Sequence, residues 1–402
     1  MSVQGAESFR LMLVAGEESG DAHAAALVRA LRETAPGARF EFFGSTGAAM
    51  AREGVESVVR EEDLAITGLV EIARALPRFW AAYKALKKAA LERRPNAVVL
   101  VDWPDFNLAL ARALHRHGVR VVYYISPQLW AWRSHRVRQV RRDVDLLLTI
   151  LPFERGWYAA RGVEHVEFVG HPLAGSVAAR MTREEFRARY QLDPSKPTVA
   201  LLPGSRRKEF ERIMPVMLDA AARLIKDVPD AQFVLALAAR RSPEEATRAV
   251  AAHAEAATLA PRIRVTHDEA REALAASDVA AVCSGTATLE AALLATPLVV
   301  VYKESALNWH TLGRLIEVEH YGLVNLVAGE RLAPELMQDD FTGDTLAREL
   351  RALLDPERNA RVRARLREAT ARLGEGGASR RAAEAVLRAL RSWQEDDAAP
   401  RA

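Results

Sequence analysis

Short apolar runs alternate with longer helical segments along most of the chain, a pattern typical of α/β folds. In the first half, apolar runs predict strands at residues 9–14, 40–43, 97–101, 119–125, 145–150 and 166–169. In the second half, they predict strands at residues 198–202, 232–237, 263–266, 278–283 and 297–302. The run at 97–101 has no polar alternation, which indicates a parallel strand buried on both faces. The pattern predicts two Rossmann-like, doubly wound α/β domains that face a cleft.

The break between the two sets of strands falls at Gly170-His171-Pro172-Leu173. We therefore expect one domain over residues 1–172, a second over 173–343, and C-terminal helices with a polar tail over 344–402. A lone histidine at such a junction is more often structural than catalytic. The tail from Gln394 is expected to be disordered.

The turn from Ser284 to Glu290 separates a predicted strand from a helix predicted at 291–295. Ser284, Gly285 and Thr286 are small, so backbone N–H groups stay free, and the helix start adds partial positive charge that favours a phosphate. Glu290 falls about one turn further on, where a carboxylate can accept hydrogen bonds from sugar hydroxyls. The alternative is an ordinary helix start capped by Ser284 or Thr286, and the turn alone slightly favours that alternative.

A second turn of this kind follows the predicted strand 198–202. Gly204 and Ser205 precede a helix start, and Arg206 can meet a phosphate with two parallel hydrogen bonds. A solvated basic turn explains the same residues equally well.

Polar residues also follow the predicted strands of the first domain. Glu17, Ser19 and Asp21 come after strand 9–14, in a turn that lacks the spaced glycines of nicotinamide or flavin binders. Asp102 and Asp105 come after strand 97–101, where open α/β sheets bind ligands. Asp105 can be explained as a helix cap. Asp102 has no such explanation and is the better catalytic candidate.

The segment 64–91 is a greasy predicted helix with interleaved lysines and arginines, which Pro77 is expected to break in two. Core packing is the favoured explanation, although basic aromatic helices also suit a membrane surface. The arginine run after Trp132 and Arg133 would ordinarily be a solvated helix face. Two tryptophans leading into it make an anionic or interfacial ligand more plausible.

Composition narrows the functional classes. The chain has 402 residues, 27% of them charged, with a net charge of +3, which is a mild excess for a nucleic-acid-binding protein. Because Cys283 is the single cysteine, the chain has no internal disulfide. We interpret Cys283 as a small core residue. No signal-peptide pattern opens the sequence, and no apolar run approaches the about 20 residues that span a bilayer. We expect a cytoplasmic protein.

Eight motifs in this order resemble the lipid-A-disaccharide synthases, a family of GT-B glycosyltransferases, and together they reach to about Gly329. One motif, at Asp102, carries Trp103 where the family commonly has a smaller residue. The matching stretches are Ala15–Asp21, Asp102–Asn107, Ser126–Arg133, Leu151–Glu154, Gly170–Leu173, Leu202–Arg206, Ser284–Glu290 and Asn325–Gly329.

The resemblance implies an inverting transfer from UDP-2,3-diacylglucosamine to 2,3-diacylglucosamine 1-phosphate, giving a β-1,6-linked lipid A disaccharide 1-phosphate and UDP. Asp102 would be the base, with Asp105 as the alternative. No metal and no cofactor are expected, and Asp143-Val144-Asp145 is interpreted as structural. UDP would be bound by Gly204, Ser205, Arg206, Ser284, Gly285, Thr286, Glu290 and Asn325, and further cleft residues would be Glu17, Ser19, Asp21, Trp132 and Arg133.

Because both substrates carry acyl chains, part of 64–86 and the arginines from Arg133 to Arg142 are expected to touch an anionic membrane surface. The resemblance places this contact on the inner face of the cytoplasmic membrane, and makes the first domain the acceptor side and the second the UDP-sugar side. It also suggests a homodimer, with which the helices after Asp344 are compatible. Nucleic acid is not an expected partner.

Two other functions remain open. One is a UDP-sugar epimerase or transferase of the same two-domain fold that acts on non-lipid sugars. The other is a nucleotide-sugar-binding or membrane-surface protein without catalysis, which the joint presence of Asp102, Arg206 and Glu290 disfavours.

Overall fold

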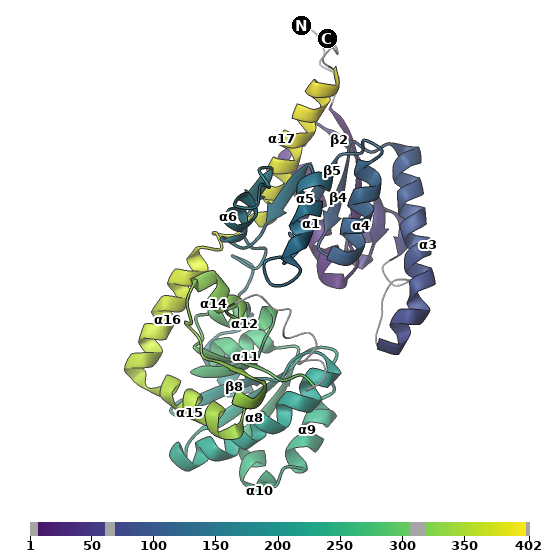
Figure 1. The fold of residues 1–402 in the computed structure, drawn as a ribbon. Helices are drawn as coiled ribbons and strands as arrows, with labels where there is room; N and C mark the ends of the chain where they lie inside the picture. The colour runs from purple at the N-terminus through teal and green to yellow at the C-terminus, as the bar shows by residue number, and fades with distance from the viewer. Residues whose placement is uncertain (1–6, 61–68, 306–318, 399–402) are drawn as a thin grey trace. The chain divides into compact units, whose positions relative to one another are not determined.

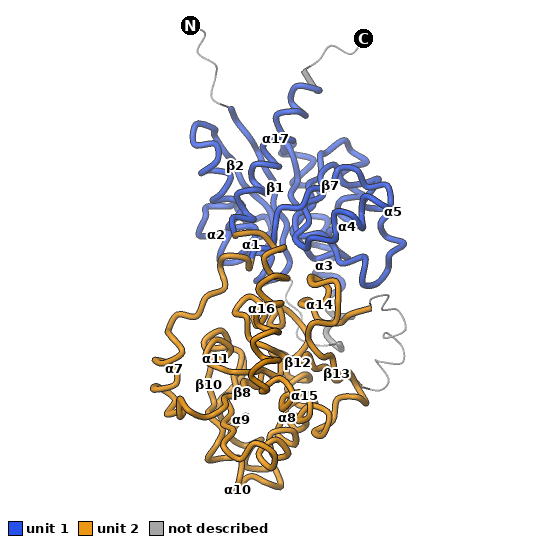
Figure 2. Tube along the Cα trace, turned by 90° about the vertical axis from the view of Figure 1, so that its left-hand side faces the viewer, with its two compact units in different colours: residues 1–172, 376–402 blue, residues 173–375 orange. Residues whose placement is uncertain are grey.

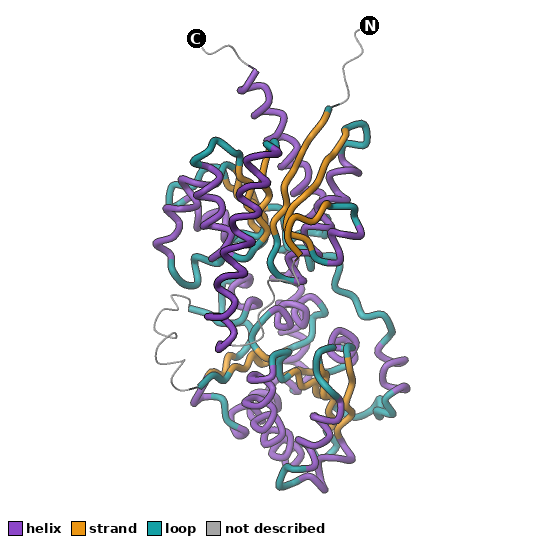
Figure 3. Tube along the Cα trace, turned by 90° about the vertical axis from the view of Figure 1, so that its right-hand side faces the viewer, coloured by secondary structure: helices purple, strands orange, loops and turns teal. Residues whose placement is uncertain are grey.

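The computed structural model describes residues 7–60, 69–305 and 319–398 (Figure 1). The chain forms two compact units, which Figure 2 distinguishes by colour. Unit 1 contains residues 1–172 and 376–402, and unit 2 contains residues 173–375. In both units the strands lie among helices, as Figure 3 shows. Each unit is described by itself.

Unit 1 is built on a seven-stranded sheet in the order β3-β2-β1-β4-β5-β6-β7, with every pair parallel. The order reverses between β1 and β4, and the carboxyl ends of these strands are where ligands bind in open α/β sheets. The strands are β1 Ser8–Val14, β2 Arg39–Thr46, β3 Glu56–Arg60, β4 Ala97–Val101, β5 Val121–Tyr124, β6 Leu146–Thr149 and β7 Val166–Phe168.

Alternate residues of these strands supply two apolar layers, as the period of a strand requires. Leu11 and Leu13 pack with α1 and α17, while Met12 and Val14 pack on the other face with α3 and α4. The helices of this unit are α1 Glu18–Thr34, α2 Ala48–Arg52, α3 Leu69–Arg93, α4 Pro104–His115, α5 Val137–Asp143, α6 Glu154–Ala159 and α17 Ala378–Ala398, with a 3-10 turn at Ser134–Arg136.

Unit 2 is built on a six-stranded parallel sheet in the order β10-β9-β8-β11-β12-β13, which reverses between β8 and β11. The strands are β8 Thr198–Leu202, β9 Gln232–Leu237, β10 Ile263–His267, β11 Val279–Cys283, β12 Leu298–Tyr302 and β13 Glu335–Met337. The helices are α7 Arg183–Arg189, α8 Arg207–Asp227, α9 Pro243–Ala251, α10 Ala256–Leu259, α11 Ala270–Ala276, α12 Thr286–Leu293, α14 Leu323–Ala328, α15 Gly343–Leu354 and α16 Pro356–Ala371. The prediction of two parallel α/β sheets is confirmed.

The C-terminal helices do not form a segment of their own. α15 and α16 belong to unit 2, where Leu346 and Leu350 enter the core. α17 belongs to unit 1, because its apolar stripe, which includes Val386 and Leu390, packs with α1. Sequence periodicity identifies such a stripe but not the core that receives it.

Several element boundaries differ from the prediction. α3 continues through Pro77, since a proline removes one hydrogen bond of a helix without always ending it. The expected helix residues 64–68 lie outside the described residues. α17 reaches Ala398, so the tail expected to be disordered from Gln394 begins as helix. The short strands β3 and β13 were not predicted, because their apolar runs are too brief to stand out.

Candidate active site

Two turns lie side by side at the carboxyl edge of the unit 2 sheet. β8 and β11 are neighbours, with Leu202 opposite Val282, so the turns that follow them begin at the same level. Each turn leads directly into a helix, α8 or α12. The adjacency follows from the strand order, which the sequence could not give.

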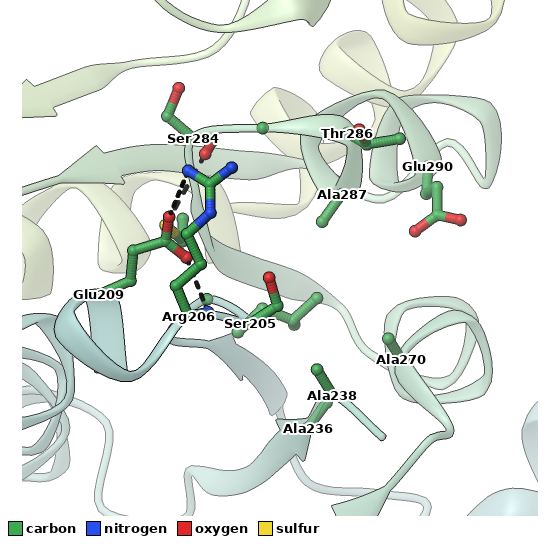
Figure 4. A pocket seen from close by; sticks show the side chains of 14 residues that line it. Ser205, Arg206, Glu209, Ala236, Ala238, Ala270, Ser284, Thr286, Ala287 and Glu290 are labelled. Atoms are coloured by element: carbon green, nitrogen blue, oxygen red, sulfur yellow. Dashed lines mark hydrogen bonds and ion pairs between the residues drawn. The ribbon is translucent and has the colours of Figure 1, made fainter. Parts of the chain in front are cut away.

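These turns line a pocket of about 380 Å³ (Figure 4). Seven predicted UDP-binding residues are among its lining: Gly204, Ser205, Arg206, Ser284, Gly285, Thr286 and Glu290. The remaining lining residues, which sequence reasoning did not select as site residues, are Leu202, Glu209, Ala236, Ala238, Ala270, Cys283 and Ala287. The small alanines leave room between the two turns.

Both glycines of the pocket have backbone conformations that other residues rarely adopt. Gly204 has a φ of +101°, and a Cβ there would lie 2.7 Å from Glu209 Oε2 and 3.1 Å from Cys283 Sγ. Gly285 has a φ of +149° and open space around its Cβ position. Glycine therefore keeps the first turn tight and leaves the second open to close approach.

The start of α12 does not match the alternative of an ordinary capped helix. The helix begins at Thr286, its N-cap is Gly285, and no side chain caps it. The hydroxyl of Ser284 donates instead to the Tyr321 carbonyl at 3.2 Å. First-turn N–H groups of a helix need partners, so an uncapped start facing a pocket is suited to an anion.

Arg206 extends from the opposite turn, with 83% of its side chain exposed. Its Nη1 lies 3.5 Å from Glu209 Oε1, and its backbone N–H donates to Glu209 Oε2 at 3.1 Å. An ion pair with so exposed an arginine contributes little to stability. The guanidinium of Arg206 is therefore available to an anionic ligand. Glu209, which sequence reasoning missed, holds the turn through the backbone of Arg206.

Glu290 is held by a residue that the sequence did not indicate. Arg271 of α11 donates to Glu290 Oε1 from Nε at 2.9 Å and from Nη2 at 2.7 Å. The Glu290 side chain is only 17% exposed. This two-point contact fixes the carboxylate at the edge of the pocket.

Cys283 closes the back of the pocket beneath Gly204. Burial raises the pKa of its thiol to about 12. The thiol therefore stays protonated at neutral pH and is no nucleophile. It packs in the unit 2 core, as the sequence indicated.

Asn325 does not line this pocket. Its side chain is fully buried and its amide donates to the Ala333 carbonyl and to Glu335 Oε1, both at 2.8 Å. Glu335 in turn accepts the N–H groups of Tyr321 and Gly322. These bonds give Asn325 a structural task in the loop beneath Ser284, and a contact with UDP stays a prediction without support here.

In unit 1, Asp102 follows the switch-point strand β4. It and Trp103 are consecutive non-glycine residues with φ near +50°, at +49° and +50°. Burial raises the pKa of the Asp102 carboxyl, and the nearby charge of Glu17 raises it further, against a backbone N–H at Trp103 that lowers it. A carboxyl with a raised pKa is a stronger base than an ordinary aspartate.

Asp105 has different surroundings. Its Oδ1 accepts from Arg133 at 2.9 Å and from Arg136 at 2.5 Å, and the guanidinium of Arg133 lies 4.1 Å from the centre of the Trp132 ring. It does not cap α4, whose N-cap is Trp103 and has no side-chain cap. The explanation of Asp105 as a helix cap is therefore wrong, because its carboxylate is bound by two arginines.

The three candidates after β1 separate in the structure. Glu17 and Ser19 are exposed, and the charge of Glu17 contributes to the raised pKa of Asp102. Asp21 is buried and accepts the backbone N–H groups of Gly47, Ala49 and Met50 at 2.6 to 3.1 Å. Asp21 thus caps the start of α2, a structural role that the sequence did not reveal.

No group of three or more metal-ligating side chains occurs within residues 7–60, 69–305 and 319–398. In the Asp-x-Asp stretch, Asp143 is buried and pairs with Arg142, and Asp145 accepts the Val121 N–H at 2.8 Å. Both carboxylates therefore have internal partners.

In the same ranges, no helix has the length and apolar character that crossing a bilayer requires.

Comparison with known proteins adds sequence relatives. A family model described as Lipid-A-disaccharide synthetase matches residues 11–389. A lipid-A-disaccharide synthase from Trichlorobacter lovleyi is 44% identical over 379 residues, which cover 94% of this chain and 97% of that protein. One from Geobacter sulfurreducens is 42% identical over 384 residues, covering 95% of this chain and 98% of that protein.

Solved structures of similar fold have low sequence identity. The S. aureus MnaA-UDP co-structure matches with a TM-score of 0.61 and 14% identity, covering 96% of this chain and 97% of that one. The UDP-GlcNAc 2-epimerase from Neisseria meningitidis matches with a TM-score of 0.62 and 11% identity, covering 94% of this chain and 100% of that one. The calicheamicin glycosyltransferase CalG4 matches with a TM-score of 0.58 and 17% identity, covering 96% of this chain and 99% of that one. At these identities the likeness concerns the fold.

Proposed function

The chain belongs to the lipid-A-disaccharide synthase family and is a glycosyltransferase of lipid A biosynthesis, and we propose that its units divide the reaction between donor and acceptor. The donor is UDP-2,3-diacylglucosamine and the acceptor is 2,3-diacylglucosamine 1-phosphate. The observation that carries this division is the unit 2 pocket, where two glycine turns, Arg206 and an uncapped helix start meet.

In this pocket the diphosphate of UDP lies between the turns at Gly204 and Gly285. Arg206 and the N–H groups at the start of α12 stabilise the negative charge that grows on the leaving group. Glu290, fixed by Arg271, accepts hydrogen bonds from the ribose hydroxyls.

The acceptor side is formed by unit 1, with Asp102 as the base. Asp102 takes the proton of the acceptor 6-hydroxyl as that oxygen attacks the sugar carbon that bears UDP. The new carbon–oxygen bond forms as the bond to the phosphate oxygen breaks, and UDP leaves with the electron pair. A single displacement inverts the configuration and gives the β-1,6 linkage. Asp105 is the weaker candidate, since two arginines already bind it.

A two-substrate assay tests the reaction. We expect UDP and a β-1,6-linked disaccharide 1-phosphate to form only when UDP-diacylglucosamine and the acylated acceptor are both present. An epimerised sugar nucleotide formed without the acceptor would favour the epimerase alternative. Transfer to non-lipid sugars at a similar rate would favour a general transferase.

We also propose peripheral binding to the cytoplasmic face of an anionic membrane, through α3. Among its described side chains, Leu76, Trp80, Lys84 and Lys88 are exposed at intervals of four residues and so share one face. Leu76 is 61% and Trp80 58% exposed, and Lys84 Nζ lies 5.3 Å from the centre of the Trp80 ring. Apolar and basic groups on one helix face suit the boundary between lipid headgroups and acyl chains.

Vesicle binding tests the membrane proposal. We expect the protein to sediment with anionic vesicles at low salt and less so at high salt. Absence of binding at low salt would contradict it.

A further inference from the structure

The turn that carries Asp102 is held in a conformation that its residues do not favour. Asp102 and Trp103 both have left-handed φ values, +49° and +50°. A non-glycine residue in this region is strained, and such strain persists only where the surrounding structure holds it. The structure identifies what holds it.

Two buried side chains bind the same backbone oxygen of this turn. The Tyr123 hydroxyl donates to the Asp102 carbonyl at 2.6 Å, and the Asn107 amide donates to it at 2.8 Å. Tyr123 and Asn107 are both fully buried. The carbonyl therefore has both of its acceptor sites occupied and cannot turn without breaking two buried hydrogen bonds.

The orientation of the Asn107 amide supports this interpretation. Its Nδ2 also donates to the Val101 carbonyl at 3.2 Å, whereas its buried Oδ1 has no partner among the described residues. A flipped amide would place oxygen against two carbonyl oxygens, so the side chain serves the turn as a donor. Leaving a buried acceptor unpaired has a cost, which indicates that the donor contacts matter more.

Tyr123 remains a donor throughout the working pH range. Burial, and then the charge of Asp102, raise the pKa of its hydroxyl well above the ordinary value. The ring of Trp103 also restrains the turn, because it packs against the backbone of Gly16. A Cβ at Gly16 would lie only 2.1 Å from this ring.

We propose that Tyr123 and Asn107 are positioning residues that hold the strained turn and thereby aim the Asp102 carboxylate at the acceptor hydroxyl. The proposal rests on the role of Asp102 given above. Both side chains are fully buried and bind the Asp102 carbonyl, so both act through the backbone of Asp102. Small displacements of a reacting group have large effects on rate.

Tyr123→Phe tests the proposal, because it removes only the hydroxyl. We expect kcat at saturating substrates to fall about 10- to 100-fold, with the affinity for UDP unchanged. Asn107→Ala should act in the same direction and serves if Tyr123→Phe folds poorly. Tyr124→Phe is the matched control, since Tyr124 is the adjacent buried tyrosine whose side chain packs on the other face of the sheet, and it should keep wild-type kcat.

The Asp102→Asn background separates positioning from general destabilisation. If Tyr123 acts through Asp102, Tyr123→Phe should have almost no further effect on the residual turnover of Asp102→Asn. An equal fold loss in both backgrounds, or a kcat equal to that of Tyr124→Phe, would overturn the positioning role alone. Near-normal turnover of Asp102→Asn itself would overturn the base assignment and this inference together.

Discussion

Asp102 and Asp105 stand three positions apart, yet their surroundings give the two carboxylates different chemistry. Asp105 is 65% exposed and bound by Arg133 and Arg136. Asp102 makes no ion pair within the described residues, and burial raises its pKa. At the scale of single residues, this difference supports Asp102 as the proposed base, because it lacks a compensating cation.

Replacing Asp102 by Asn removes the proposed base and keeps the shape of the side chain. We expect kcat to fall by about 10²- to 10⁴-fold, the usual contribution of a general base. The affinity for UDP, measured by calorimetry, should be nearly unchanged because the pocket proposed for UDP lies in unit 2. Asp105→Asn is the control and should lose much less. A larger loss for Asp105→Asn would exchange the two roles.

The same substitution should stabilise the protein at neutral pH. The pKa of Asp102 is higher folded than unfolded, so folding disfavours the ionised form. Its contribution to stability is therefore complete below the unfolded pKa and is lost as pH rises through the folded pKa. Asn carries no charge and tolerates left-handed φ. Thermal melts should give Asp102→Asn a higher Tm than wild type at pH 7 and no such advantage near pH 3, and an equal or lower Tm at pH 7 would contradict this.

At the scale of elements, the two turns of unit 2 depend on their glycines. Gly204→Ala would set a Cβ against Glu209 and Cys283 at a φ of +101°. We expect a loss of about 1–3 kcal/mol in stability and a raised KM for the UDP-sugar. Gly329→Ala is the matched control, because Gly329 has a φ of +72° but open space and lies outside the pocket lining. It should lose stability without a change in KM.

The proposed membrane contact of α3 is tested at its exposed face. Leu76→Ser with Trp80→Ser removes the two large exposed apolar side chains found among the described side chains of α3. Burial of each in a membrane is worth about 1.5–3 kcal/mol, so vesicle affinity should fall by at least about tenfold. Thermal stability should change little because both side chains are exposed. Unchanged vesicle binding would contradict the proposed role of this face of α3.

Sequence patterns predicted elements better than they predicted side-chain partners. The strands β8 and β9 begin and end where their apolar runs do. The turn residues around Gly204 and Gly285 were found because strand, glycine and helix follow in order. Asp21 shows the limit of this reasoning, since a polar residue after a strand can serve a ligand or the backbone equally well, and Asp21 binds backbone N–H groups. Arg271 could not be found, because only the packing of α11 beside α12 brings it to Glu290.

At the scale of the whole molecule, the chain ends in the unit where it began. Residues 173–375 form unit 2, and the remainder returns to unit 1 through a stretch in which Gly374, Gly376 and Gly377 have left-handed φ. α17 then anchors itself by Arg388 to Glu167 and Arg391 to Glu7. No sequence pattern within 344–402 indicates that α16 packs in unit 2 and α17 in unit 1. The prediction therefore placed both helices in one C-terminal segment.

A chain that is truncated after Glu375 should therefore have a destabilised unit 1, although most of that unit lies in residues 1–172. α17 supplies Val386, Leu387 and Leu390 to the unit 1 core. Three such side chains contribute about 1.5–3 kcal/mol each, a sum comparable to the about 5–15 kcal/mol that stabilises a whole domain. We expect the truncated chain to lose the melting transition of unit 1 and all transferase activity while it still binds UDP through unit 2. A truncated chain with wild-type melting would show that unit 1 is complete without α17. Loss of UDP binding together with unit 1 would show instead that the two units fold as one.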